Sequence, residues 1–433
     1  MATFSSPIQD DLAVNWHPFM QMKDFETRPP IRIVSAKGLR LQGEDHWYYD
    51  TISSWWCNLL GHGHPAINEA LRHQLDQFGH IMFGNFTHDP AIQLSKRLVS
   101  ITPSQLTRVY YSDNGSTAIE VACKMALHYW RNKGEPQKNR LVAFDGSYHG
   151  DTIGAMSLGG VHQYNGMFGS VMFDAMSLPN PSVNESRALD ELHRVLQASS
   201  HHIAAVSIEP LLMGAGGMTL TSLDFYYQVR QLTHQYNVSL ISDEVATGFG
   251  RTGHLFVSTA AGVCPDYLCL SKALTNGQFP LAVTMTTDEV FSAFYDDFEA
   301  GKTFYHGHTF TANPLGCCIA NATIDSLMAW DWATHVASLH DALRQGMQAL
   351  VDDYDGLSNL RTVGTVAAMD VDLPGHRALF HLAQRAFDHH LVLRPLGNSV
   401  YLFLPLVTTL DECRAILGHL RDLFRGCGGW HQS

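Results

Sequence analysis

The stretch Tyr267-Leu268-Cys269-Leu270-Ser271-Lys272 is an apolar, strand-like run that ends in a lysine. Between Arg108 and about Thr287, other short β-rich runs of this kind alternate with longer segments whose apolar residues have helical spacing. Such alternation is typical of crossover units, which build a mostly parallel sheet covered by helices. The sequence therefore predicts a large α/β domain, with strands over Arg108–Ser112, Arg140–Phe144, Ile203–Ile208, Val238–Ser242, Tyr267–Leu270 and Leu281–Thr286.

The two chain ends differ from this central pattern. The first 60 residues are rich in Trp and Pro and hold short strand-like runs such as His46–Tyr49, and they do not resemble a unit that folds alone. The last hundred residues predict a helix near Ala378–Phe387 and then strands within Leu391–Leu404, around a turn at Pro395–Gly397. We therefore expect a small α+β domain made from residues 1–65 and 331–433, beside a large domain of residues 66–330.

Composition bounds the class of protein. The chain has 433 residues, a net charge of −13 and only 16% charged residues, against about 25% in ordinary globular chains. Low charge with normal apolar content indicates a large core or an oligomer interface. The acidic balance, without a basic run, argues against nucleic acid as a partner. No stretch has the ~18 apolar residues of a membrane span and no signal peptide is evident, so we expect a cytoplasmic protein. Its eight scattered cysteines predict reduced thiols.

A polar turn at Ser112–Thr117 could hold a phosphate. It follows an apolar strand and precedes a segment with apolar residues at helical spacing, in which Thr117 and Glu120 have capping-box spacing. Unpaired N–H groups at a helix N-terminus attract anions, and Gly115 and Ser116 would allow close approach and donate a hydroxyl. An ordinary capped turn explains the same residues.

Two further side chains stand where strands are predicted to end. Asp243 closes the run Ile241-Ser242-Asp243, and ligands of open parallel sheets lie beyond the carboxyl ends of strands. Lys272 closes its own apolar run, and a desolvated lysine has a lowered pKa and can form Schiff bases. A turn residue and a solvated surface lysine are the alternative interpretations.

Two other patterns carry less weight. Gly248–Gly253 matches the GxGxxG dinucleotide fingerprint, but no convincing helix follows and no strand ending in an acidic residue lies about 20 residues on. The pairs His62/His64 and His306/His308 lack a Cys or carboxylate at the usual spacing for a metal site, so loop histidines are the better interpretation.

Taken together, the motifs resemble the class III aminotransferases, which depend on pyridoxal phosphate and have fold type I. The resemblance covers nearly the whole chain and rests on the order Gly115-Ser116, Gly146–Asp151, Glu209-Pro210, Asp243–Gly253, Ser271-Lys272-Ala273 and Thr309–Pro314. It implies an α/β fold and a homodimer with shared active sites. Within the family, a branch transfers an amino group, usually from S-adenosylmethionine, to 8-amino-7-oxononanoate, a precursor of biotin. The chain is similar to that branch at Trp16-His17-Pro18, Ser53–Trp56, Met82-Phe83-Gly84, Tyr148–Thr152 and Arg394-Pro395.

The resemblance also implies roles for cofactor-binding residues. Lys272 would hold the cofactor covalently and act as general base and acid. Asp243 would pair with the pyridine nitrogen and keep it protonated. The phosphate would be bound by Gly115 and Ser116, with Thr309 reaching from the partner subunit. Tyr148 and His308 complete the expected cofactor contacts.

The expected substrate contacts centre on Arg394. This arginine lies in an apolar run, so it needs a carboxylate partner, which is either the substrate's or an internal Asp or Glu. Trp55 and Trp56 would form apolar walls that also suit a sulfonium cation. We expect both on a strand, where neighbours point in opposite directions and one of them can be a core residue. Phe19, Tyr148, Asp151 and Gly307 complete the set, with Asp151 facing the substrate's amino group.

Three departures leave the amino donor open. Phe19 replaces the usual Tyr, which removes a hydroxyl worth about 0.5–1.5 kcal/mol if it made one net hydrogen bond. Met213 replaces Gln, and His308 replaces a common Pro. Phe19, Tyr295-Asp296-Asp297 and His306-Gly307-His308 are similar to a branch that uses lysine as donor, whereas Trp55-Trp56 favours S-adenosylmethionine. A broader ω-aminotransferase and, in another class, a dinucleotide-dependent oxidoreductase remain alternatives.

Overall fold

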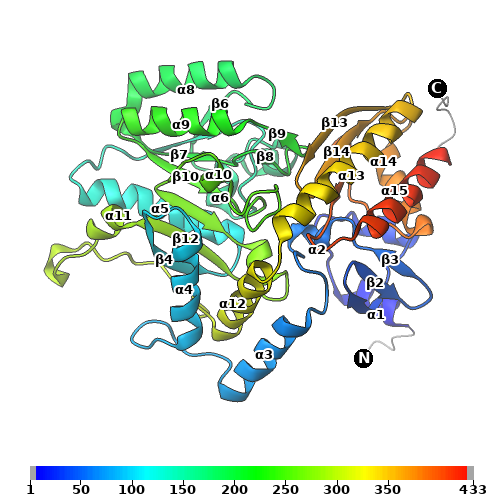
Figure 1. Cartoon of the computed structure of the whole chain (residues 1–433). Coiled ribbons are helices and arrows are strands. Elements are labelled where there is room, and N and C mark those ends of the chain that lie inside the picture. The colour runs from blue at the N-terminus through cyan, green and yellow to red at the C-terminus, as the bar shows by residue number, and fades with distance from the viewer. Residues whose placement is uncertain (1–5, 427–433) are drawn as a thin grey trace.

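The computed structural model describes residues 6–426. Its centre is a seven-stranded sheet of order β4-β12-β11-β10-β7-β5-β6 (Figure 1). The pairs from β11 to β6 are parallel, whereas β12 runs antiparallel to both neighbours. This confirms the mostly parallel sheet. The exception arises because a short link, and not a crossover helix, joins β11 to β12. The strands are β4 (Leu106–Ser112), β5 (Arg140–Phe144), β6 (Met176–Leu178), β7 (Ile203–Ile208), β10 (Ser239–Asp243), β11 (Tyr267–Leu270) and β12 (Ala282–Thr287).

Helices bury both faces of this sheet. Alternate residues of β11 show the division, because Tyr267 and Cys269 pack in the cluster formed by α5, whereas Leu268 and Leu270 pack with α4 and α12. Burial on both faces explains why β11 is a continuous apolar run. The long helices around the sheet are α3 (Pro65–Gln77), α4 (Asp89–Ile101), α5 (Gly115–Asn132), α8 (Glu185–Ser199), α9 (Leu223–Gln235) and α12 (Pro314–Met328).

Segments from both chain ends share a second core. Leu39 and Tyr49 from the N-terminal part pack in one apolar cluster with residues between Leu339 and Phe424. Figure 1 shows the blue and the orange-to-red elements side by side. The division at residues 65 and 330 stays a prediction, with which this packing agrees. The elements are β1 (Ile33–Lys37), β2 (Arg40–Gly43), β3 (Trp47–Tyr49), α13 (Trp332–Asp353), β13 (Leu357–Val363), β14 (Val366–Val371), α14 (Ala378–Ala386), β15 (Ser399–Phe403) and α15 (Leu410–Arg425).

Short elements connect these parts. They include α1 (Pro7–Val14), α2 (Ser53–Trp56), α6 (Ile153–Ser157), α7 (His162–Asn165), β8 (Leu212–Met213), β9 (Thr219–Leu220), α10 (Val257–Ala260) and α11 (Asp288–Ser292). Within residues 6–426, no helix is long and apolar enough to cross a membrane. The seven cysteines in that range are free, and Cys427 lies outside it.

Two local expectations were wrong. The capping box of α5 joins Asn114 and Thr117, while Glu120 instead accepts hydrogen bonds from the Thr152 hydroxyl and the Gly154 amide. Of the segment 391–404, only β15 is a strand. Its first half makes single bridges, such as Leu391 with Tyr49, and Pro395 has no N–H with which to continue a ladder.

Candidate active site

Lys272 lies directly beyond the carboxyl end of β11, at the first position of a short 3-10 turn. Its φ of +46° is left-handed, a conformation that is uncommon for a residue other than glycine. The Nζ atom lies 4.5 Å from the ring centroid of Trp56. Burial lowers the pKa of Lys272, although the charges of Asp243 and Glu209 oppose that shift. A lowered pKa increases the fraction of the lysine that is present as the neutral, nucleophilic amine.

Asp243 ends β10, the strand next to β11, so its carboxylate lies at the same edge of the sheet. One carboxylate oxygen is 2.7 Å from Nδ1 of His149, and the other accepts a hydrogen bond from the Val245 amide at 3.0 Å. The His149 side chain is completely buried, and its Nε2 lies 3.3 Å from the Ser207 hydroxyl. Burial alone lowers the pKa of His149, but the hydrogen bond and charge of Asp243 raise it overall.

Glu209, just after β7, adds a second carboxylate to this edge. It accepts hydrogen bonds from the amides of Tyr148 at 2.7 Å and Gly214 at 3.2 Å. Burial raises the pKa of Glu209 to about 7, and the charge of Asp243 acts in the same direction. The loop that carries Tyr148 and His149 is therefore bound to both carboxylates.

The N-terminus of α5 lies beside this group. A Cβ atom on Gly115 would be 2.7 Å from a Val245 methyl, so only glycine allows the helix to approach the segment after Asp243. The Ser116 hydroxyl accepts a hydrogen bond from the Asp151 amide at 3.2 Å. The first amides of a helix have no intrahelical partner and carry the positive end of its dipole. This terminus therefore presents anion-binding groups toward the Asp243 side of the site.

Arg394 lies among aromatic rings at another part of the site. Its guanidinium carbon is 4.1 Å from the Trp55 ring centroid and 5.5 Å from that of Phe19. Burial lowers its pKa, and the nearby Tyr401 and Tyr164 oppose this shift. No Asp or Glu in the described part of the chain forms an ion pair with Arg394. The arrangement suits a carboxylate that comes from a ligand.

The expectation of a strand at Trp55 and Trp56 was wrong. Both lie in the short helix α2, whose four residues all have positive φ, between 44° and 73°. This strained turn directs each indole toward a different cation: Trp55, 39% exposed, toward Arg394, and Trp56, 5% exposed, toward Lys272. The two tryptophans are thus both part of the candidate site, but Trp56 is a buried wall and only Trp55 is open.

Aromatic side chains connect the Arg394 end with the Tyr148 loop. Tyr164 makes edge contacts with Phe19, at 5.6 Å between ring centroids, and with Tyr148, at 5.9 Å. Burial raises the pKa of Tyr148, as do the charge and hydrogen bond of Asp151. Tyr148 and the exposed Asp151 therefore lie together, between the buried carboxylates and the aromatic wall.

Gly307, His308 and Thr309 lie elsewhere. They line a cleft of about 810 Å³ with residues of β4 and with Met82 and Phe83, and none of Lys272, Asp243 and Arg394 belongs to that lining. The His308 amide and carbonyl both bond to the Thr311 hydroxyl, which fixes the loop. Within one chain, the structure does not bring these three residues to Lys272.

The glycine loop 248–253 has a structural function. Its Arg251 side chain is completely buried and donates to the carbonyls of Leu404 and Asn58. A Cβ atom on Gly364 would lie 2.2 Å from the Arg251 carbonyl, so the backbones themselves are in contact. The loop thus ties the central sheet to the segments from the chain ends, and none of its residues lines either of the two described clefts. Its neighbour Glu244 is also buried and accepts the amides of Val257 and Ser258.

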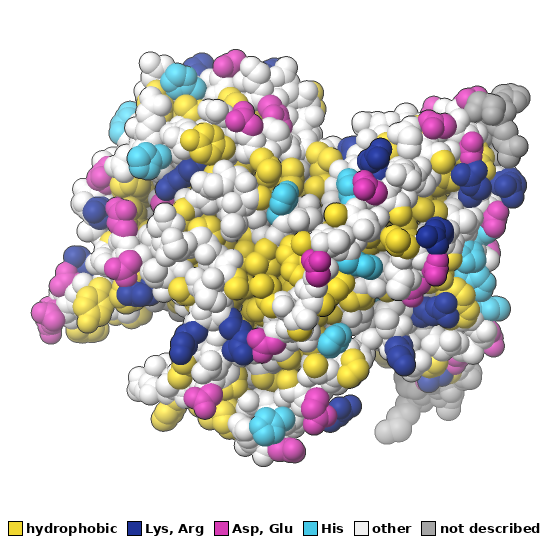
Figure 2. Space-filling model, in the orientation of Figure 1, with side chains coloured by type: hydrophobic (Ala, Val, Ile, Leu, Met, Phe, Trp, Pro, Cys, Tyr) yellow, Lys and Arg dark blue, Asp and Glu magenta, His cyan; other side chains and the backbone are white. Residues whose placement is uncertain are grey.

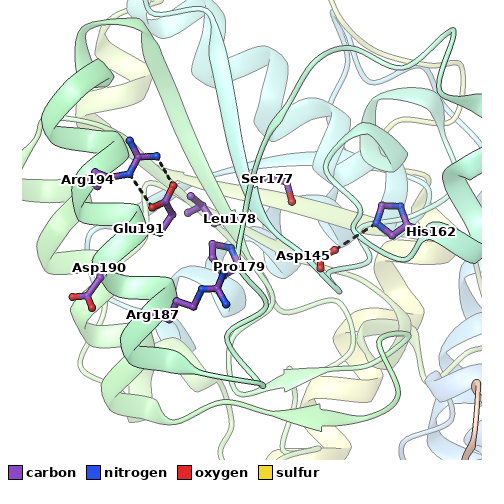
Figure 3. Close-up of a pocket in the computed structure, with 9 residues that line it drawn as sticks. All are labelled: Asp145, His162, Ser177, Leu178, Pro179, Arg187, Asp190, Glu191 and Arg194. Carbon is purple, nitrogen blue, oxygen red and sulfur yellow. Dashed lines mark hydrogen bonds and ion pairs between the residues drawn. The ribbon is translucent and has the colours of Figure 1, made fainter.

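A second hollow, of about 730 Å³, lies at the β6 edge of the sheet (Figure 3). Of its charged groups, Arg194 pairs with Glu191 at 2.9 Å and His162 lies 4.0 Å from Asp145. Its lining includes none of the residues Lys272, Asp243, Glu209 and Arg394. Residues 6–426 also hold no cluster of His, Cys, Asp and Glu suited to a metal ion.

Three residues of the site, His149, Glu209 and Tyr164, have no role that the sequence alone predicts. His149 and Glu209 occur in quoted motifs, but only the fold shows that they contact Asp243 and the Tyr148 loop. Tyr164 lies in a stretch without any motif.

The residues present fit pyridoxal phosphate. An amine without an acidic ion-pair partner, a carboxylate held by His149 and a capped helix N-terminus lie around one sheet edge, and they match the aldehyde, ring nitrogen and phosphate of that cofactor. Lys272, Asp243, Gly115 and Ser116 would hold it, with Tyr148 beside the ring.

Comparison with known proteins agrees with this arrangement. The model of the class III aminotransferase family matches residues 22–424. The chain is 42% identical over 425 residues to the adenosylmethionine-8-amino-7-oxononanoate aminotransferase of Synechococcus elongatus, with 94% of this chain and 97% of the relative covered. It is 38% identical to the enzyme of that name from Geobacter sulfurreducens, over 92% of each chain.

Solved structures give the same result. The adenosylmethionine-8-amino-7-oxononanoate aminotransferase of Methanocaldococcus jannaschii is 32% identical, with a TM-score of 0.92 over 96% of this chain and 98% of that one. A pyridoxal-phosphate-bound amine transaminase from an uncultivated Pseudomonas species is 28% identical, with a TM-score of 0.90 over 96% and 99%. The chain belongs to the class III aminotransferase family and is a pyridoxal-phosphate-dependent transaminase of fold type I.

Proposed function

We propose that this enzyme transfers an amino group from S-adenosylmethionine to 8-amino-7-oxononanoate, giving 7,8-diaminononanoate for biotin formation. The observation that carries the proposal is Arg394, a partly buried cation walled by Trp55 and Phe19 without an acidic partner in residues 6–426. The acceptor has an alkyl chain that ends in a carboxylate, so it matches both the rings and the guanidinium. Relatives that bear the corresponding name support the same substrate pair.

Each side chain then has a definite task. Bound pyridoxal phosphate supplies an electron sink for the carbon that carries the amino group. Lys272 holds the cofactor and moves protons at that carbon through Nζ. Asp243, oriented by His149, places negative charge beside the ring nitrogen and keeps it protonated. The α5 terminus binds the phosphate.

The aromatic wall acts on the substrate. An apolar surface between Arg394 and Tyr148 is formed by the rings of Trp55, Phe19 and Tyr164. An alkyl chain bound against these rings would be shielded from water. Asp151 lies at the open side beside Tyr148. There its carboxylate can accept a hydrogen bond from the free amino group of 8-amino-7-oxononanoate. Carboxylate, chain and amine would then each have a matching surface.

The donor is tested by its half-reaction. Lysine is the second candidate because Phe19 stands where the adenosylmethionine branch usually has Tyr, and because Arg394 and Lys272 already face the indoles that would otherwise face a sulfonium. Purified holoenzyme should lose its visible cofactor absorbance with S-adenosylmethionine and keep it with lysine. If lysine alone bleaches the absorbance, lysine is the donor and S-adenosylmethionine is not. If only a generic ω-amine bleaches it, the biotin assignment is refuted.

We also propose a cytoplasmic homodimer whose sites are shared. The cleft of Gly307–Thr309 lies apart from Lys272 and is bordered by the exposed Met82 and Phe83, so it can complete a site only in a second copy. Hydrophobic side chains gather in the middle of the face in Figure 2, with charges mainly toward its margins. Sedimentation should give a dimer, and a stable, active monomer would refute this proposal.

A further inference from the structure

The indole of Trp56 is held rigidly. Its Nε1 donates to the Tyr401 hydroxyl at 3.0 Å, and its ring stacks on Phe403 with 5.6 Å between centroids and an angle of 23°. A Cβ atom on Gly214 would lie 3.0 Å from the Trp56 ring, so the backbone of Gly214 packs tightly against it. The backbone of Trp56 is itself left-handed, with a φ of +73°. Contacts on several sides thus fix where the face of this ring points.

What this ring faces is the Lys272 amine, 4.5 Å from the centroid. In the described part of the chain, no Asp or Glu forms an ion pair with Lys272. The ionisable groups that act on it from neighbouring elements are Asp243 and Glu209 from two strand ends, Cys57 beside Trp56, and Arg251 from the glycine loop. The aromatic face is therefore its closest recorded partner, and an ammonium over an indole is stabilised relative to the neutral amine.

We propose that Trp56 is a positioning residue that holds the amino group of Lys272 over its indole whenever that group is not bonded to the cofactor. The inference rests on the proposed role of Lys272. It assigns Trp56 a task different from the substrate wall, since only 5% of this residue is exposed. This contact would keep the Lys272 amine near the reacting carbon while the amine is free of the cofactor. It would also hold the proton of the ammonium form over the Trp56 indole. The hydroxyl of Tyr401 sets the orientation of the ring.

The chain contains a matched control for this interaction. Trp130 is equally buried, its Nε1 donates to the Ala204 carbonyl at 2.8 Å, and Lys138 lies 3.8 Å from its ring centroid. Trp130 lies near the C-terminal end of α5 and Lys138 lies in the link between α5 and β5, and neither belongs to the candidate site. Replacing Trp130 therefore reproduces the loss of a buried indole under a lysine without touching Lys272.

The test is the rate at which apoprotein takes up pyridoxal phosphate as a function of pH, followed by visible absorbance, for wild type, Trp56→Leu, Trp56→Phe and Trp130→Phe. Uptake requires the neutral amine, so the inflection of the rate-versus-pH profile reports the titration of Lys272. The cofactor itself titrates identically in all four experiments, so differences between the proteins come from the protein. Loss of the ring should move the inflection to lower pH by about 0.5–1.5 units in Trp56→Leu. Trp56→Phe should show a smaller shift in the same direction, and Trp130→Phe none.

An unchanged inflection in folded Trp56→Leu would overturn the inference, as would an equal shift in Trp130→Phe. If Trp56→Leu does not fold, the position of the Trp56→Phe inflection decides in the same way. A wild-type protein that takes up no cofactor would instead refute the proposed function, so the two failures are distinguishable.

Discussion

Nδ1 of His149 lies 2.7 Å from Oδ2 of Asp243, and the His149 side chain has no exposed surface. The pair joins the loop after β5 to the end of β10, so the fold itself fixes the carboxylate that we propose faces the cofactor ring. His149 is a positioning residue for Asp243, with Ser207 behind it.

Replacing His149 should weaken catalysis through Asp243. A hydrogen bond to a charged group contributes about 1.5–3 kcal/mol, so His149→Phe should lower kcat about 10- to 100-fold if that energy is lost in the transition state. His149→Gln retains an N–H donor and should lose less. Steady-state kinetics of both variants provide the check, and equal losses would exclude the hydrogen bond as the cause.

The same pair predicts a pH dependence of stability. The folded-state pKa of His149 lies above its usual value of about 6.5. Its contribution is therefore fully present below about pH 6.5 and is lost as pH rises through the raised pKa. The stability advantage of wild type over His149→Phe, measured by urea unfolding from pH 6 to 9, should shrink with rising pH. An advantage that grows would contradict this assignment.

Arg394 should determine acceptor binding. Arg394→Lys keeps the charge but loses the planar fork and its stacking on Trp55, so KM for 8-amino-7-oxononanoate should rise about 10- to 100-fold. The donor half-reaction with S-adenosylmethionine should change little. Arg40 provides a matched control, because it stacks on Trp47 at 4.4 Å away from the site. An Arg40→Lys variant with the same rise in KM would refute a specific role for Arg394.

Glu244 should be a stability residue and not a catalytic one. It is completely buried and accepts the amides of Val257 at 2.7 Å and Ser258 at 2.8 Å. Glu244→Ala leaves two buried N–H groups unpaired, at about 1–3 kcal/mol each, so the free energy of unfolding should fall by about 2–6 kcal/mol. Glu44→Ala, which removes an exposed ion pair with Arg32, should have little effect. Similar losses for both would contradict the argument.

Subunit complementation tests the shared site. Lys272→Ala and Thr309→Trp proteins should each be inactive, but a mixture that exchanges subunits should regain about a quarter of wild-type activity, because one site in each heterodimer has both residues intact. Lys272→Ala mixed with Asp243→Asn should regain none, since both residues belong to the same site in one chain. Absence of rescue in the first mixture would place Thr309 outside the partner's site.

Local patterns predicted much of this molecule. The strands Ile203–Ile208 and Tyr267–Leu270 were expected at the observed bounds, because β-rich apolar runs buried on both faces have no competing pattern. The left-handed turn of α2 was not predictable, since positive φ at Trp55 and Trp56 contradicts their local preference and is imposed by tertiary packing. The same holds for Tyr164 and for the contact of His149 with Asp243, which depend on segments far apart in the sequence.

The central claim is amino transfer to 8-amino-7-oxononanoate through Lys272. Its most direct measurement is mass spectrometry of the products formed by wild-type holoenzyme and by Lys272→Ala with S-adenosylmethionine and 8-amino-7-oxononanoate. We expect 7,8-diaminononanoate with wild type and none with Lys272→Ala. Absence of this diamine with wild-type holoenzyme, for either S-adenosylmethionine or lysine as donor, would contradict the claim.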